Sequence, residues 1–301
     1  MTFPPDILTF DVEEWFHGHN YLRQVPPETW DDQVCRVEQN TDRCLELLAR
    51  RGVKGTFFVL GWTAERYPSL VRRIGDAGHE IACHSYAHPE LFNLDETAFR
   101  ADLERALAAL SAAGVSTVAG YRAPSFSLTP PVHRYLHILR DHGFAYDCSL
   151  FPVHHPRYGQ ADAPREPFLL DGAAAQASGP DREPLLVLPM TTARVLGVNV
   201  GFAGGGYLRI LPRGAYRALR RLARRQGQAV VTYLHPWELD EWRPRDVGQP
   251  RFQRWCSQGG QHTVLVKLEG ILREGRFSTM GEYAQALRTD GALPSRGLPL
   301  C

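Results

Sequence analysis

The sequence has few of the features that mark secreted, membrane-spanning or nucleic-acid-binding proteins. Its cysteines form no Cys-x-x-Cys pair, which argues against a zinc knuckle and favours reduced thiols in the core over a disulfide framework. These six residues are Cys35, Cys44, Cys83, Cys148, Cys256 and Cys301. The 34 basic and 33 acidic residues give a formal net charge of +1, so no overall charge attracts nucleic acid or an anionic membrane.

Long hydrophobic runs are also absent near the start of the chain. No basic region precedes the apolar run from Ile7 to Phe10, and that run is far too short for a signal peptide or a membrane span. We therefore expect a cytoplasmic protein with no transmembrane segment and no nucleic-acid partner. The sequence gives no indication of the oligomeric state.

What the sequence does contain is a regular alternation of short β-prone runs and amphipathic stretches. With 44% hydrophobic and 22% charged residues, its composition is that of a globular protein. The predicted strands are Ile7–Phe10, Gly55–Leu60, Glu80–Cys83, Thr117–Tyr121, Phe144–Asp147, Leu185–Pro189 and Val230–Leu234. The predicted helices between them cover residues 38–51, 63–77, 95–113, 130–142 and 212–226.

This alternation predicts the fold class. Because each strand is followed by a helix, we expect an α/β fold, a distorted (β/α) barrel of about seven parallel strands over residues 1–240. Residues 241–301 contain two more predicted helices, Thr263–Arg273 and Met280–Leu287, and should pack on the barrel as a C-terminal extension. The loop from Val153 to Pro184 is long enough to be either functional or disordered.

Acidic residues alternate at the end of the first predicted strand. Side chains two positions apart share a face of a strand, so Asp11 and Glu13 can point to one side while Glu14 points to the other. This geometry allows a base and a metal ligand to lie side by side. The alternative is that these residues only solubilise the end of the strand.

Two histidines four positions apart follow the third predicted strand. His84 and His88 can reach one ion from a single turn or a short loop, and Pro89 disfavours helical geometry at His88. Because they follow the strand Glu80–Cys83, they lie where parallel α/β folds place their active sites. With twelve histidines in the chain, such a pair can also arise by chance.

Three further side chains lie at the ends of predicted strands. Arg122 is costly to bury without a carboxylate partner, so it can hold Asp11 or another carboxylate in place; an ordinary surface arginine is the alternative. Asp147 also follows a β-prone run and could have a similar role in the site, but its sequence context is weaker evidence. His235 follows the most β-prone run of the chain and is suited to proton donation near neutral pH, although a buried core histidine would give the same pattern.

Two other motifs have less specific interpretations. The helix predicted over residues 212–226 is rich in arginine and could bind an anionic glycan or a phosphate-bearing carrier lipid, but such a run is more often only a solvated helix face. Its arginines are Arg213, Arg217, Arg220, Arg221, Arg224 and Arg225. Gly204-Gly205-Gly206 lacks the strand and helix context of a phosphate loop, so we interpret it as a backbone feature rather than a nucleotide site.

Taken together, these segments resemble the polysaccharide deacetylases of carbohydrate esterase family 4, the NodB-homology group. The resemblance is carried by Thr9–Glu14, His84–His88, Arg122–Pro124 and Leu234–Pro236. Other segments more narrowly resemble the branch found in exopolysaccharide biosynthesis loci, including those linked to exosortase systems. They are Thr9–Trp15, the loop from Tyr158 to Arg165, Gly204–Pro212 and Tyr233–Glu238.

The resemblance implies a single divalent metal ion, with zinc expected first and cobalt, nickel or iron as alternatives. The implied roles are metal ligand for Glu13, His84 and His88, catalytic base for Asp11, orientation of that base for Arg122, and catalytic acid for His235. The family's first motif has two adjacent aspartates, whereas Val12 separates Asp11 from Glu13 here. Because Glu13 shares a strand face with Asp11, it is favoured as the metal ligand, and Glu14 stays an alternative. Asp147 is assigned to the family's fourth motif.

The implied reaction is removal of N-acetyl groups from hexosamine units of a polysaccharide or its precursor, which could be lipid-linked. Asp11 would take a proton from the attacking water, a backbone N–H after Arg122 could stabilise the oxyanion, and His235 would protonate the amine.

Two alternative functions remain open. One is a hydrolase of small cyclic amides or ureides, of the allantoinase-like kind, and the other is a catalytically silent glycan-binding barrel. The aromatic residues Trp15, Tyr158 and Trp237 suit sugar stacking but could equally close a small pocket.

Overall fold

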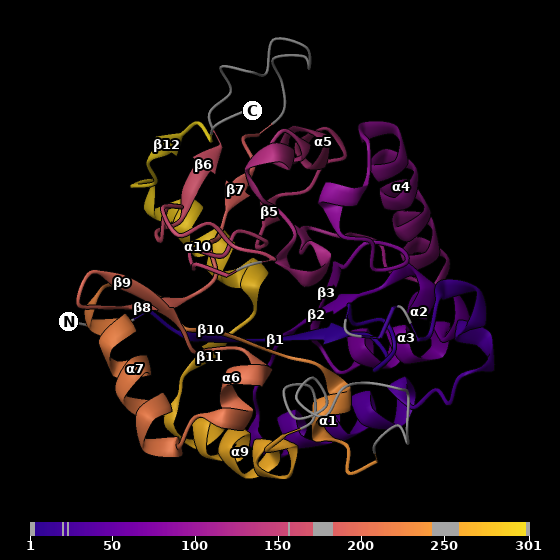
Figure 1. The fold of residues 1–301 in the computed structure, drawn as a ribbon, viewed down its shortest axis with the longest axis horizontal. Helices are drawn as coiled ribbons and strands as arrows, with labels where there is room; N and C mark the ends of the chain where they lie inside the picture. Colours follow the sequence, from indigo (N-terminus) through magenta and orange to yellow (C-terminus); the bar gives the residue numbers. More distant parts are fainter. Residues whose placement is uncertain are drawn as a thin grey trace.

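A computed structural model describes residues 4–298 of the chain, except for 20, 23, 156, 171–182 and 243–258. Within these residues, ten strands form one sheet in the order β10-β1-β2-β3-β4-β5-β7-β6-β12, with β11 paired to β1. All its ladders are parallel except the one between β6 and β7. Strand β1 lies in the middle of the molecule, beside β10 (Figure 1).

The seven predicted strands are all present, several of them shorter than expected. They are β1 (Asp6–Val12), β2 (Thr56–Val59), β3 (Glu80–Cys83), β4 (Gly120–Tyr121), β5 (Tyr146–Asp147), β7 (Leu186–Val187) and β10 (Val231–Leu234). The strands not predicted are β6 (Phe168–Leu170), β8 (Thr192–Val195), β9 (Val198–Gly201), β11 (Phe277–Ser278) and β12 (Ser295–Arg296). β8 and β9 form a separate antiparallel hairpin.

The predicted helices are present, one of them divided in two, and the helix from Gly205 to Ile210 was not predicted. The described α-helices are α1 (Val37–Arg51), α2 (Gly61–Arg66), α3 (Pro68–Asp76), α4 (Glu96–Ala112), α5 (Tyr135–Asp141), α6 (Gly205–Ile210), α7 (Arg213–Arg225), α9 (Val264–Glu274) and α10 (Met280–Asp290). The single helix predicted over residues 63–77 is two, because Tyr67 precedes Pro68 and adopts a non-helical conformation. Asp95 caps α4 by accepting a hydrogen bond from the Ala98 N–H at 2.8 Å.

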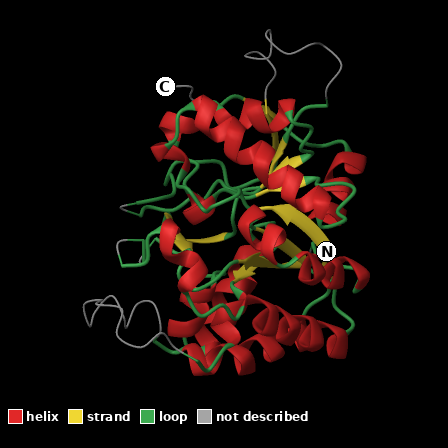
Figure 2. Cartoon of the chain, turned by 90° about the vertical axis from the view of Figure 1, so that its right-hand side faces the viewer, coloured by secondary structure: helices red, strands yellow, loops and turns green. Residues whose placement is uncertain are grey.

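The predicted α/β class with a mostly parallel sheet is therefore confirmed. The strands run through the centre of the molecule, with helices packed on both sides (Figure 2). Among the described residues no ladder joins β10 to β12, so closure of the sheet into a barrel stays a prediction. The C-terminal segment does more than pack on the sheet, because β11 pairs with β1 and β12 pairs with β6.

Alternation along β1 explains how the sheet positions polar residues. Leu8, Phe10 and Val12 point into the largest hydrophobic cluster, where the Phe10 ring stacks on Phe57 with centroids 4.9 Å apart. Thr9 and Asp11 therefore point to the opposite face, although every residue of β1 is buried. This strand carries its polar side chains into the interior of the protein rather than to its surface.

The arginine-rich helix α7 has a structural role on its inner side. Arg220 and Arg224 contact the buried carboxylate of Asp6 at the start of β1. Glu274, at the end of α9, accepts contacts from Arg213, Arg217 and Arg220. The outer arginines, Arg221 and Arg225, are exposed. Within the described ranges, no helix is both long enough and apolar enough to cross a bilayer.

Candidate metal centre and active site

The candidate residues gather where adjacent parallel strands end. Glu13 follows β1, His84 follows β3, Arg122 follows β4 and His235 follows β10. These strands lie close together in the sheet, so their carboxyl ends bring side chains from distant parts of the sequence to one edge. The sequence-based expectation that the four segments form one site is consistent with this arrangement.

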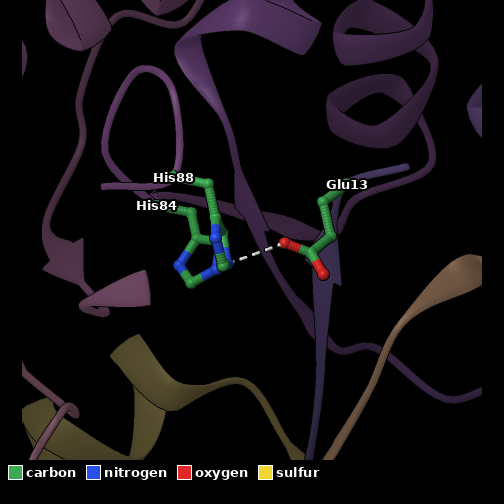
Figure 3. Close-up of side chains that lie close together, drawn as sticks. All are labelled: Glu13, His84 and His88. Carbon is green, nitrogen blue, oxygen red and sulfur yellow. Dashed lines mark ion pairs between the residues drawn. The ribbon is translucent and has the colours of Figure 1, made fainter. Parts of the chain in front are cut away.

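Glu13, His84 and His88 form a compact cluster of possible metal ligands. One ligand atom from each lies within 4.8 Å of the others, and all three residues are buried. The two imidazoles lie side by side and face the Glu13 carboxylate, with Nε2 of His88 2.9 Å from Oε2 of Glu13 (Figure 3). Such a carboxylate and two imidazoles make a donor set that suits zinc, cobalt, nickel or iron.

The surroundings of His84 and Glu13 favour the protonation states that these two residues need as metal ligands. The Nδ1 of His84 lies 2.8 Å from the carbonyl oxygen of Arg122. When Nδ1 carries the ring proton it donates to this oxygen, and Nε2 is then available as a ligand atom. Burial lowers the pKa of His84 to about 4, which keeps this imidazole neutral at pH 7. Burial would raise the pKa of Glu13, but the charge and hydrogen bond of His88 hold it well below its usual range. The residues present therefore fit a divalent ion.

Glu14, the other carboxylate considered as a ligand, points elsewhere. Its Oε1 accepts hydrogen bonds from the N–H groups of Arg36 and Val37, at the start of α1. Its own N–H donates to Nδ1 of the buried His17 at 2.9 Å. Geometry thus brings Glu13, and not Glu14, to the two histidines. Because Glu14 is buried, its pKa is raised to about 7.

Arg122 is fully buried and contacts Asp11. Its Nη1 donates to Oδ1 of Asp11 at 2.6 Å and lies 2.9 Å from Oγ1 of Thr9. The guanidinium also lies over the Phe58 ring, 4.1 Å from its centroid. The alternative of an ordinary surface arginine is therefore wrong, and the expected contact with Asp11 is present.

His235 lies between two carboxylates. Its Nε2 is 3.5 Å from Oε1 of Glu13, and its Nδ1 is 3.2 Å from Oε2 of Glu238. Burial lowers the pKa of His235, but the Glu238 hydrogen bond and the Glu13 charge outweigh it and raise the pKa to about 9. His235 is therefore protonated at neutral pH and can act as a proton donor. The Trp237 ring stacks on it, with centroids 5.0 Å apart.

Glu238 is a site residue that the sequence analysis missed. The signal was present, because Glu238 lies three positions after His235 with Pro236 between them, a spacing typical of the first turn of a helix. Its second oxygen lies 3.2 Å from Nε of Arg209. A side chain at Gly205 would overlap with the Glu238 carboxylate, so Gly205 permits this close approach. The expectation that the glycine run lacks a strand and helix context is wrong, because β9 precedes it and α6 begins at Gly205.

Asp147 is buried near the site but bonds to Ser149. Its two oxygens accept from the Ser149 N–H at 3.0 Å and the Ser149 hydroxyl at 2.5 Å. Oγ of Ser149 in turn accepts from the Ala123 N–H at 2.7 Å. The Ala123 N–H, the first after Arg122, is therefore already used within the protein, and the expected oxyanion contact from a backbone N–H after Arg122 stays a prediction. Burial raises the pKa of Asp147 to about 7.

The three aromatic residues proposed for sugar stacking have different positions. Trp15 is buried against Tyr21, and its indole N–H donates to the Val34 carbonyl, so it cannot stack on a sugar. Tyr158 and Trp237 are only partly buried. Of the loop from Val153 to Pro184 that contains Tyr158, residues 156 and 171–182 lie outside the described part of the chain.

Family models match two successive parts of the chain. Residues 27–146 match the polysaccharide deacetylase family, and residues 148–285 match a domain of unknown function, DUF3473. The two matches meet near residue 147, and the domain boundary expected at residue 240 stays a prediction. His84, His88 and Arg122 lie in the first match and His235 in the second.

Similar proteins include deacetylases of several glycans. A peptidoglycan-N-acetylglucosamine deacetylase from Bacillus cereus is 38% identical over 91 residues, which cover 30% of this chain and 30% of that protein. A chitooligosaccharide deacetylase from Rhizobium leguminosarum bv. trifolii is 39% identical over 64 residues, covering 21% of this chain and 30% of the relative. The matched region thus spans less than a third of the length of either relative.

Solved structures share the fold over nearly the whole chain. A Mycobacterium smegmatis protein assigned to the polysaccharide deacetylases superposes with a TM-score of 0.63 at 26% identity, covering 98% of this chain and 96% of that one. An allantoinase, PuuE, superposes with a TM-score of 0.58 at 17% identity, covering 94% of this chain and 89% of its own. At that identity the likeness to the allantoinase extends to the fold alone.

Proposed function

We propose that the chain is a metal-dependent hydrolase that removes N-acetyl groups from hexosamine units of a glycan, because residues 27–146 match the polysaccharide deacetylase family. The observation that carries this proposal is that a candidate base and a candidate acid accompany one cluster of possible metal ligands. Asp11, whose carboxylate is bonded to Arg122, lies two positions before Glu13 in the sequence, and His235, which contacts Glu238, lies 3.5 Å from Glu13. A binding protein needs neither a base nor an acid.

The first step requires a water molecule that can be deprotonated. Glu13, His84 and His88 would hold the divalent ion, for which we propose zinc; when bound, it polarises the acetamide carbonyl and lowers the pKa of water. Arg122 fixes the orientation of Asp11 through Oδ1, and the Asp11 carboxylate accepts the proton of the attacking water.

The second step is departure of the amine. His235 carries a proton at neutral pH because Glu238 and Glu13 stabilise its charged form. Its Nε2 faces the cluster through Glu13 and donates this proton to the leaving nitrogen, while acetate departs. Asp11 and His235 thus supply the two proton transfers of amide hydrolysis.

The proposed substrate is a polysaccharide or its precursor in exopolysaccharide synthesis, which could be carried on a lipid. Support for exopolysaccharide synthesis comes from the four segments that resemble that branch, and support for an N-acetylated glycan comes from relatives named as peptidoglycan and chitooligosaccharide deacetylases. The partly exposed Trp237 ring, which stacks on His235, offers a flat surface for a sugar ring.

A substrate panel tests this proposal. The purified protein is assayed for acetate release from N-acetylated chitooligosaccharides and for ring opening of allantoin under the same conditions. We expect acetate from the glycan and no turnover of the ureide. Allantoin hydrolysis without acetate release would instead favour a small-amide hydrolase, and calorimetric glycan binding with neither reaction would favour a silent binding protein.

A further inference from the structure

The loop that carries the two cluster histidines has an unusual backbone. Ser85 and His88 have φ angles of 70° and 57°, in the left-handed region that residues other than glycine seldom adopt. Such conformations persist only when the surrounding structure imposes them. The loop between His84 and His88 must therefore be held in shape by groups outside it.

One of these groups is the side chain of Asp102 on helix α4. Its carboxylate accepts hydrogen bonds from the Ser85 hydroxyl, the Tyr86 N–H at 3.0 Å and the Ala87 N–H at 3.4 Å. All three donors lie between the two histidines in the sequence. A charged acceptor forms stronger hydrogen bonds than a neutral one, so this side chain is well suited to oppose the strain of the loop.

The other side of the same loop is held by helix α2. The carbonyl oxygens of Ser85 and Tyr86 accept from the first N–H groups of α2, those of Gly61 and Trp62, each at 2.9 Å. A side chain at Gly61 would overlap with Tyr86, so the close approach of the helix depends on glycine. The loop is thus clamped between the start of α2 and Asp102 on α4.

We propose that Asp102 is a positioning residue that sets the affinity of the Glu13, His84 and His88 cluster for its divalent ion. It contacts the loop between the histidines and belongs to no part of the cluster itself. When these hydrogen bonds are lost, the loop relaxes toward ordinary backbone angles and the two imidazoles lose their fixed separation. This inference rests on the proposed function only through the metal centre, because it does not depend on the identity of the substrate.

The test compares metal binding by folded variants of the full chain. The dissociation constant for Zn²⁺ is measured by competition with a chromophoric chelator, and the Co²⁺ form is examined by visible absorption. We expect Asp102→Ala to weaken Zn²⁺ binding by about 10- to 100-fold and to change the Co²⁺ spectrum. The matched control is Glu104→Gln, on the same helix, whose side chain is 68% exposed and which should bind like the wild type.

Two further variants keep the test decisive if Asp102→Ala does not fold. Asp102→Asn retains one acceptor oxygen, and Ser85→Ala removes a single donor, so each should weaken binding by less than Asp102→Ala. Folded variants that all bind Zn²⁺ with wild-type affinity and show the wild-type Co²⁺ spectrum would overturn the inference.

The outcomes also separate this inference from the proposed function. A wild-type protein that binds Zn²⁺ but releases no acetate contradicts the proposed reaction and leaves the role of Asp102 to be judged by the affinities. A wild-type protein that binds no divalent ion overturns both. Acetate release by the wild type together with unchanged affinity in the variants overturns the inference alone.

Discussion

The Nδ1 of His235 lies 3.2 Å from Oε2 of Glu238, three residues further along the chain. The opposite nitrogen of the same ring faces Glu13 at 3.5 Å. His235, the candidate acid, thus lies between Glu13, which could bind metal, and Glu238, which is not part of the metal cluster. Glu238 can therefore be changed to probe the acid without removing a ligand.

Glu238→Gln should move the alkaline limb of the pH profile. The pKa of His235 is raised to about 9, so its protonated form persists through neutral pH and is lost as the pH rises through that value. Without the Glu238 charge the pKa falls, and the decline of kcat at high pH should begin about one pH unit lower. The control is Glu241→Gln, an exposed carboxylate nearby. An unmoved limb would count against His235 as the acid.

Asp11→Asn should strongly reduce turnover and preserve the fold. The amide oxygen can still accept from Nη1 of Arg122, so the buried guanidinium keeps a partner. Loss of the base should lower kcat by about 100-fold or more, with metal affinity changed by no more than about threefold. Steady-state kinetics and metal content measured on the same preparation check both statements. Near-normal turnover in this variant would refute the role of Asp11.

Asp147→Asn separates a catalytic from a structural role for that residue. Because Asp147 bonds to Ser149 and not to Arg122 or Asp11, we expect kcat at pH 7 to stay within about tenfold of the wild type, less than loss of a general acid or base would cost. A much larger loss would instead support the original assignment to the catalytic set.

The same substitution should change how stability depends on pH. Burial raises the pKa of Asp147 to about 7 from an unfolded value of 3.8, so this group favours folding below pH 3.8 and loses that contribution as the pH rises through 7. Asn does not titrate. The free energy of unfolding of the variant, relative to the wild type, should therefore increase between pH 4 and pH 8 when measured by urea denaturation.

Asp240→Asn should destabilise the protein without touching the site. Burial would raise the pKa of Asp240, but its hydrogen bond to Arg36 lowers it to about 2. The stabilisation is therefore complete above pH 4 and lost as the pH falls through 2. We expect the variant to lose about 2 kcal/mol of unfolding free energy at pH 7.

The matched control for Asp240 is Asp42→Asn. Asp42 also pairs with an arginine, Arg73, but both side chains are 41% exposed. Such a surface pair should contribute less than about 1 kcal/mol. Equal losses in the two variants would show that burial does not distinguish the pairs.

Much of the fold could be predicted because its signals are local. The β-prone run at β1 and the alternation of Asp11 and Glu13 along it required only the period of a strand. The hairpin of β8 and β9 was missed because Leu196 and Gly197 form its turn, where asparagine and glycine are the usual signal. β11 and β12 are only two residues long and, unlike β4, β5 and β7, do not lie within a longer β-prone run.

The parts of the site that could not be predicted depend on packing between distant segments. Nothing near Glu14 in the sequence shows that it meets the start of α1, so the choice between Glu13 and Glu14 needed the structure. The Ala123 N–H donates to Ser149, which follows the next strand, β5. Glu238 is the exception, because its spacing from His235 was visible and was overlooked.

The central claim is that a metal ion held by Glu13, His84 and His88 is required for deacetylation. Its most direct test measures acetate release from an N-acetylated chitooligosaccharide before chelation, after chelation, and after Zn²⁺ is restored, for the wild type and for His84→Ala. We predict that chelation abolishes release, that Zn²⁺ restores it in the wild type, and that His84→Ala is inactive throughout. Undiminished release by the fully chelated protein would contradict the account.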